Sequence, residues 1–189
     1  GNFVKQWIEH IQRGDIGEPL FIQGEYIHPE PYFYFEHNET GEPVSNSWDD
    51  MMRAARDPHY HKAWRNYFKH PIKYIPHELS PLLKIIDDRV ARVSCAASDV
   101  RSLGEDVEML DLECALMTTD KGRTLRIVNS FTVPRPGPYA HHWYHIMGTE
   151  GVLESARPGW TDGPAWNMDS ELILRRNGVL VQDVARALS

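Results

Sequence analysis

Residues 73–83 have the sequence KYIPHELSPLL and mark a change in the character of the chain. Pro76 suits the first position of a helix, because its missing N–H would have no partner there. Ile75 precedes a proline and is therefore biased toward extended backbone. Apolar residues then recur at helical spacing, which predicts a helix over residues 76–87. Its expected buried face consists of Leu79, Leu82, Leu83 and Ile86.

Beyond this helix the apolar pattern changes to a period of two, which predicts consecutive strands. The expected strands cover residues 90–97, 107–118, 123–133, 139–147 and 151–155, followed by a hairpin of 171–174 and 179–181. Asp120-Lys121-Gly122 predicts a tight turn, with Gly122 free to take a positive φ. Short turns between consecutive strands favour antiparallel pairing.

The chain before residue 73 falls into two parts. Asn2 is expected to begin a helix that ends at Gly14, and residues 20–28 form a strand. Residues 29–76 are rich in proline and aromatic residues, and we expect a loop region there, with a short helix near 48–56 and a turn over 61–68. The sequence therefore predicts one α+β domain over residues 1–189, a large, mostly antiparallel open sheet covered on one face by helices.

Composition excludes several function classes. A net charge of −7 and the lack of a basic run argue against nucleic-acid binding. No apolar segment approaches the ~18 residues that span a membrane, and the first residues do not form a signal peptide. Cys95 and Cys114 allow one disulfide, but free thiols in a reducing compartment are the simpler interpretation, so we expect a cytoplasmic protein.

Tyr74 and His77 are the first candidates for chemistry. His77 falls in the first turn of the expected helix, where the positive end of the helix dipole disfavours an imidazolium. A neutral histidine beside a tyrosine is suited to proton transfer. The alternative is that His77 only satisfies the helix start or a buried polar contact.

Other aromatic residues are candidates for substrate binding. Tyr26 and His28 alternate at the end of the first strand and share one face, so they either line the same pocket or pack in the core. Trp64, with Arg65 beside it, is suited to stacking on a sugar. Lys73 is either solvated or, if buried, an acid–base group.

The segment HHWYH at residues 141–145 suggests a metal site. On a strand, His141 and His145 face one side and His142 faces the other, so only two of them converge. Zinc would need further ligands. We therefore predict a histidine-bearing strand at a sheet face and no metal site.

Four segments in this order resemble the C-terminal domain of the Gfo/Idh/MocA oxidoreductases, the family of glucose-fructose oxidoreductase and inositol dehydrogenase. They are GDIGEPL at residues 14–20, Tyr74-x-x-His77 with Leu79-x-Pro81, RVARVSC at 89–95 and HIMGTEGVLE at 145–154. The resemblance spans residues 3–155 and places His77 where the family has its active-site histidine. It implies a sheet like that of the C-terminal domain of glyceraldehyde-3-phosphate dehydrogenase.

The resemblance also implies partners. Family members carry an N-terminal Rossmann domain that binds NAD or NADP, and this chain has neither a G-x-G-x-x-G after a strand nor the family's Lys-Pro motif. We expect that domain to be missing here. We therefore expect the isolated fragment to be inactive and to bind no cofactor. The resemblance also implies that homo-oligomers form through the sheet.

The resemblance leaves the reaction open. Many members have an aspartate four residues before the histidine, where this chain has Lys73. Tyr74-x-x-His77 with Trp64-Arg65 resembles the branch of NAD-dependent glycosidases acting on N-acetylgalactosaminides. We predict an oxidoreductase domain for a sugar, polyol or glycoside; the alternatives are such a glycosidase and a non-catalytic carbohydrate-binding or dimerisation domain. The predicted catalytic residues are His77 and Tyr74, and the predicted substrate-binding residues are Tyr26, His28, Trp64, Arg65 and Lys73.

Overall fold

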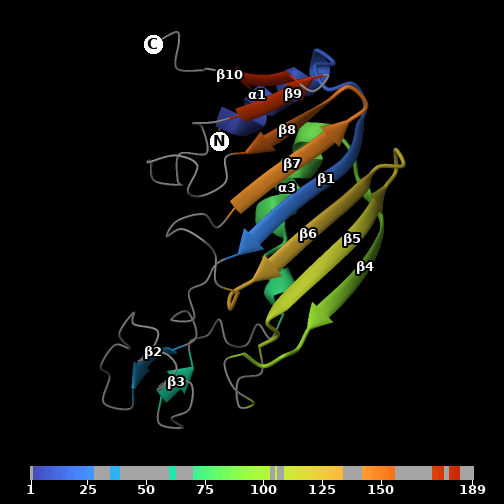
Figure 1. Cartoon of the computed structure of the whole chain (residues 1–189). Helices are drawn as coiled ribbons and strands as arrows, with labels where there is room; N and C mark the ends of the chain where they lie inside the picture. The colour runs from blue at the N-terminus through green and yellow to red at the C-terminus, as the bar shows by residue number, and fades with distance from the viewer. Residues whose placement is uncertain are drawn as a thin grey trace.

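An eight-stranded sheet forms the centre of the molecule, with the strand order β10-β9-β8-β7-β1-β6-β5-β4 (Figure 1). The computed structural model describes residues 2–27, 35–38, 60–62, 70–102, 105, 109–133, 142–155, 172–176 and 179–183. The strands of the sheet are β1 (Pro19–Ile27), β4 (Val90–Ser98), β5 (Leu112–Thr119), β6 (Thr124–Ser130), β7 (His142–Gly148), β8 (Gly151–Ser155), β9 (Leu172–Arg176) and β10 (Val179–Asp183). All neighbours pair antiparallel except β1 and β6, which are parallel.

Two helices lie on one face of this sheet, behind it in the view of Figure 1. They are α1 (Asn2–Gln12) and α3 (Pro76–Ile86), and a short 3₁₀ helix, η3 (Pro71–Tyr74), leads directly into α3. The predicted α+β class, with a mostly antiparallel open sheet covered on one face, is confirmed. Among the helices that the structure describes, none has the length and apolar character needed to cross a membrane.

The position of β1 in the sheet determines which side chains meet at one edge. β1 runs parallel to β6, so both strands end at the same edge. β7 runs antiparallel to β1 and therefore starts there, with Tyr26 directly opposite His142. Successive residues of a strand alternate between faces, so Tyr26 lies on the helix-covered face with Ile22 and Gly24.

The core lies between the helices and the sheet. Trp7, Ile22, Leu82, Leu125, Ile127 and Ile146 are all fully buried there. Gly24 allows α3 to approach the sheet closely, because a Cβ at this position would lie 3.0 Å from the Cβ of Glu78 and 2.9 Å from Ile127 Cδ1. The closeness of α3 to β1 brings the first turn of the helix against the end of the strand.

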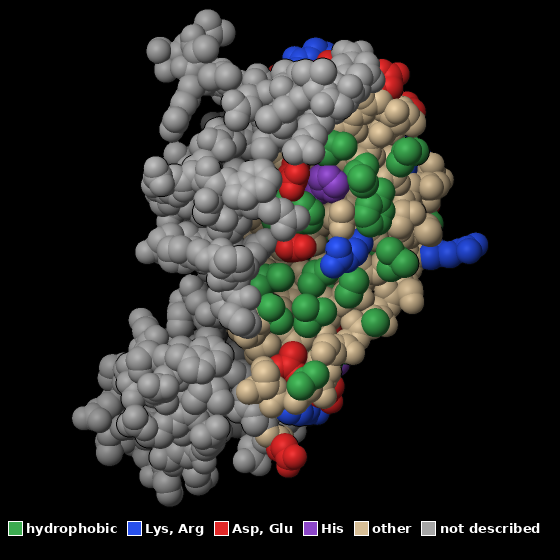
Figure 2. Space-filling model, viewed as in Figure 1, with side chains coloured by type: hydrophobic (Ala, Val, Ile, Leu, Met, Phe, Trp, Pro, Cys, Tyr) green, Lys and Arg blue, Asp and Glu red, His purple; other side chains and the backbone are tan. Residues whose placement is uncertain are grey.

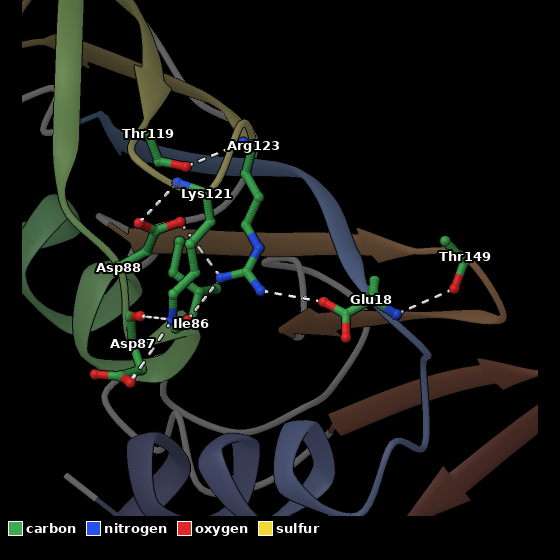
Figure 3. A network of polar contacts seen from close by, with 8 residues as sticks. All are labelled: Glu18, Ile86, Asp87, Asp88, Thr119, Lys121, Arg123 and Thr149. Carbon is green, nitrogen blue, oxygen red and sulfur yellow. Dashed lines mark hydrogen bonds and ion pairs between the residues drawn. The ribbon is translucent and has the colours of Figure 1, made fainter.

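A polar network fixes the other end of α3 (Figure 3). Nη1 of Arg123 donates to the carbonyl of Ile86 at 2.7 Å and lies 3.4 Å from Oδ2 of the buried Asp88, while Nη2 lies 3.3 Å from Oε2 of Glu18. The backbone N–H of Glu18 in turn donates to Oγ1 of Thr149 at 3.0 Å. The end of α3 is thereby tied to the β5–β6 turn, to the residue before β1 and to the β7–β8 turn.

The structure corrects several sequence-based boundaries. The strand predicted from residue 107 begins at Leu112, because the Asp111 carboxylate accepts the N–H groups of Val100 at 2.8 Å and Ser102 at 3.0 Å and so belongs to a loop. β2 (Phe35–Asn38) and β3 (Tyr60–Lys62) pair antiparallel within the expected loop region, where a turn was predicted from residue 61. The helix predicted near 48–56 lies outside the described residues.

The two cysteines are free thiols, as predicted. In the β4–β5 register Cys95 lies opposite Ala115, whereas Cys114 lies opposite Ala96. Opposed residues in a sheet share a face and successive residues alternate, so the two cysteines point to opposite faces. This register excludes a disulfide between them.

The second face of the sheet carries no helix in the described part of the chain, and Figure 2 shows hydrophobic side chains interspersed with charged groups over it. Leu116 is 50% exposed and Met147 is 42% exposed on this face. Between them, Arg126 Nη1 donates to Oε1 of Gln23 at 2.8 Å, and Nε2 of Gln23 lies 3.1 Å from Nδ1 of His145. Oligomerisation through this face stays a prediction.

Candidate active site

Five aromatic rings meet where β1 and β6 end, β7 begins and α3 starts. They belong to Tyr26, Tyr74, His77, Phe131 and His142, which we call the aromatic cluster. The centroid of the Tyr26 ring lies 5.2 Å from that of His77, 5.8 Å from that of Tyr74 and 5.0 Å from that of His142. Tyr74 in turn contacts Phe131 edge-to-face at 4.9 Å. Residues far apart in the sequence thus form one site.

The buried Glu113 of β5 holds η3, and with it Tyr74, against the sheet. Its Oε2 accepts the backbone N–H of Ile72 at 2.9 Å, and its Oε1 lies 2.9 Å from Nδ1 of His70. The side chain of Glu113 is only 5% exposed, so these hydrogen bonds are largely shielded from water.

Replacing Glu113 by alanine is expected to lower the free energy of unfolding by about 1–3 kcal/mol, because the N–H of Ile72 loses its acceptor. Glu113→Gln keeps an oxygen acceptor and should recover part of the loss, and Glu9→Ala on the exposed side of α1 should change little. Urea unfolding of the full-length protein measures all three. A Glu113→Ala variant as stable as Glu9→Ala would contradict this anchoring role.

The pKa of His77 lies below its ordinary value, which favours the neutral imidazole. Its partial burial lowers its pKa by penalising the charged form, and repulsion from His142 lowers it further. The Tyr144 hydroxyl donates to the backbone carbonyl of His77 at 3.2 Å, which fixes the first turn of α3. The sequence predicted a neutral histidine from the helix dipole; in the structure, desolvation is the first cause of the lowered pKa and His142 is the second.

A buried carboxyl group lies directly beneath the aromatic cluster. The side chain of Glu78 is fully buried, and its Oε1 lies 2.5 Å from Nδ1 of His142. Burial raises the pKa of Glu78 to about 9. The sequence analysis did not single out Glu78, and it considered His142 only as a possible metal ligand. The signal for Glu78 was present, because it precedes the buried Leu82 by four residues and therefore lies on the same face of α3.

Asn129 is a second buried polar residue near the aromatic cluster. Asn129 is fully buried beside Tyr26 in the β1–β6 register, on the helix-covered face. Neither polar atom of its amide, nor Oε2 of Glu78, has a hydrogen-bond partner within the part of the chain that the structure describes. Buried polar atoms without a partner are uncommon, and each calls for an explanation such as a bound polar molecule.

The structure brings together three of the predicted site residues, Tyr26, Tyr74 and His77. Lys73 lies beside Tyr74 on η3 with its side chain exposed. The other predicted substrate-binding residues, His28, Trp64 and Arg65, lie outside the described residues. In the segment that suggested a metal, His142 faces the helices and His145 faces the open side, and no group of three or more potential metal ligands occurs among the described residues.

No family model matches the chain. A curated relative, glycosyl hydrolase family 109 protein 2 of Phocaeicola vulgatus, is 25% identical over 174 residues, which cover 80% of this chain and 37% of that protein. The chain thus spans well under half of the length of the relative that it matches.

Solved structures share the fold over almost the whole chain. The aldose-aldose oxidoreductase of Caulobacter crescentus, complexed with glycerol, has a TM-score of 0.60 and 12% identity, over 95% of this chain and 43% of that one. An inositol dehydrogenase homolog of Azotobacter vinelandii, complexed with NADH and myo-inositol, has a TM-score of 0.57 and 16% identity, over 95% and 39%. An NAD binding oxidoreductase of Klebsiella pneumoniae has a TM-score of 0.58 and 18% identity, over 94% and 42%.

The chain therefore shares its fold with part of these oxidoreductases, which agrees with the sheet that the resemblance implied. It spans about two fifths of the length of these structures.

Proposed function

We propose that this chain is the substrate-binding, C-terminal domain of an NAD(P)-dependent oxidoreductase that acts on a sugar, polyol or glycoside. The observation that carries the proposal is the position of His77 at the start of α3, in ring contact with Tyr26 and Tyr74. The lowering of its pKa by burial supports it. The fold that it shares with an inositol dehydrogenase homolog supports it. A dinucleotide-binding domain elsewhere in the full-length protein would hold the cofactor, and we place that protein in the cytoplasm.

The roles of the residues follow from their chemistry. His77, as a neutral imidazole, accepts the proton of the substrate hydroxyl group. Tyr74 orients that hydroxyl or shares its proton, and Tyr26, which is only 8% exposed, supports the rings of His77 and Tyr74 from below. The nicotinamide supplies the hydride acceptor. In such a reaction the proton leaves the substrate to a base, and the hydride leaves to the nicotinamide. A neutral base in an aromatic-lined site therefore fits such a cofactor.

A second candidate is an NAD-dependent glycosidase of the N-acetylgalactosaminidase-like type. The 25% identity to a family 109 glycosyl hydrolase favours it. In this reaction a transient oxidation of the sugar acidifies a neighbouring C–H bond, and His77 serves as the base for elimination. No pair of carboxylates is needed for this reaction.

The full-length protein, supplied with NAD⁺ or NADP⁺, tests the proposal. We expect one of two results. Either reduced nicotinamide forms with a member of a panel of polyols and aldoses, as measured by its absorbance, or the aglycone is released from a nitrophenyl N-acetylgalactosaminide. The first result identifies the dehydrogenase, and the second identifies the glycosidase if release requires NAD⁺. Binding of carbohydrate without either reaction would overturn the enzymatic proposal in favour of a binding or dimerisation domain.

A further inference from the structure

The contact between Glu78 and His142 defines where the protons of the site lie. Oε1 of Glu78 and Nδ1 of His142 are 2.5 Å apart, so a proton must lie between them. The carboxyl group is fully buried, whereas the side chain of His142 is 31% exposed. His142 is therefore open to solvent in part, while its carboxyl partner is not.

Four proton arrangements are compatible with this contact. In one, a neutral Glu78 donates its O–H to Nδ1; in another, the proton has moved to give a carboxylate and an imidazolium. Both leave a proton on Nε2 of His142. In the third, a neutral His142 with its proton on Nδ1 faces an ionised Glu78, which leaves a buried negative charge without a compensating cation. In the fourth, Nδ1–H of His142 donates to a neutral Glu78 that carries its proton on Oε2. This arrangement leaves a buried O–H without an acceptor, because Oε2 has no partner in the described part of the chain.

The surroundings of Glu78 oppose the third arrangement. The titratable side chains that the structure places against it in the described part of the chain are His142 and Tyr144, both from β7. Neither of them is permanently cationic. The raised pKa of Glu78, about 9, agrees with a carboxyl group that stays protonated.

We propose that Glu78 is a positioning residue that keeps Nε2 of His142 protonated, so that His142 donates a hydrogen bond to the substrate oxygen whose proton His77 accepts. The inference rests on the proposed function of this site. The ring centroids of His77 and His142 are 6.3 Å apart. Because a hydrogen-bonded oxygen lies roughly 4 Å from the centre of an imidazole ring, one oxygen atom can contact both.

The arrangement divides the chemistry between two histidines. As His77 removes the hydroxyl proton, negative charge develops on the substrate oxygen, and a donor already aimed at that oxygen stabilises the charge. His77 cannot supply this donor, because it acts as the acceptor. The site therefore selects a substrate with a hydroxyl group that can reach both rings.

The test uses the full-length protein with ¹⁵N-labelled histidine. In the wild type, the ¹⁵N shifts of His142 should show a protonated Nε2 from pH 6 to pH 8. Glu78→Gln supplies an amide N–H to Nδ1 and should preserve this state, whereas Glu78→Met supplies no donor and should allow the Nδ1–H tautomer. With the polyol or glycoside found in the turnover screen, Glu78→Met should lower kcat at least ~10-fold, and Glu78→Gln should recover most of that loss.

An Nδ1–H tautomer in the wild type would overturn the inference, even if the methionine variant failed to fold. A glutamine variant that keeps the wild-type melting temperature but is as slow as the methionine variant would also overturn it. The proposed function fails separately, if turnover survives the loss of His77, and the tautomer measurement does not depend on that result.

Discussion

The full-length protein with His77→Gln should turn over its substrate ~10²–10⁴-fold more slowly than the wild type, the range typical of a lost general base. Glutamine keeps polar volume at the start of α3 but cannot accept a proton at neutral pH. Substrate affinity should change much less than kcat, because Tyr26 and Tyr74 remain in place. Steady-state kinetics of the variant and the wild type measure both quantities.

The pH dependence gives a second measure of the same role. Because burial lowers the pKa of His77 from its ordinary value of 6.5, its base form should persist into mildly acidic solution. The acid limb of the wild-type rate profile should therefore have its midpoint below pH 6.5, and this limb should disappear in His77→Gln. The rate should fall as the pH falls through that midpoint, since protonation removes the acceptor.

His145→Gln is the matched control, because His145 lies on the open face of the sheet beside Gln23. It should leave both kcat and the pH profile unchanged. Turnover in His77→Gln within a few-fold of the wild type would reject the assigned role. It would then favour a domain that binds carbohydrate or mediates dimerisation.

Local sequence patterns predicted much of the fold, because most of its elements carry their own signal. The period-two segments became β4 to β8, and Pro76 with the following apolar spacing marked α3. The pairing of β1 with β6 carries no such signal, since it joins residues about a hundred positions apart in parallel. That pairing is what brings Tyr26 beside Asn129 at the edge where α3 begins.

The candidate site was predictable only in part for the same reason. Tyr74 and His77 are three residues apart on adjoining helical elements, so the sequence alone could associate them. His142 lies directly opposite Tyr26 on the neighbouring strand β7. The sequence indicated only that His142 faces the side opposite to His141 and His145. Glu78 was overlooked because a glutamate in the first turn of a helix is usually solvated and interacts favourably with the helix dipole. Its burial here follows from the close approach of α3 to the sheet at Gly24.

A second large effect is expected from Gly148→Ala, at the end of β7. A Cβ at this position would lie 2.1 Å from the carbonyl oxygen of Ile16 and 3.0 Å from its carbon. Both are backbone atoms, so no side-chain rotation relieves the overlap. The same oxygen accepts the N–H of Glu150 at 2.9 Å, and the side chain of Ile16 is fully buried, so Ile16 cannot move without breaking other contacts. We expect a loss of about 3 kcal/mol in the free energy of unfolding, at the upper end of the range for overpacking.

Gly14→Ala separates this steric effect from ordinary backbone strain. Gly14 has a φ of +73° and no atom within 4 Å of an added Cβ, so its substitution should cost only about 1–2 kcal/mol. Urea unfolding of the full-length protein, together with hydrogen exchange of peptides from β1 and β7, measures both variants. Faster exchange confined to these two strands is expected for Gly148→Ala, because the overlap forces apart the entry to β1 and the end of β7. If Gly148→Ala were as stable as Gly14→Ala, the prediction would be wrong. The close packing of Ile16 on Gly148 would then not be what holds the entry to β1 in place.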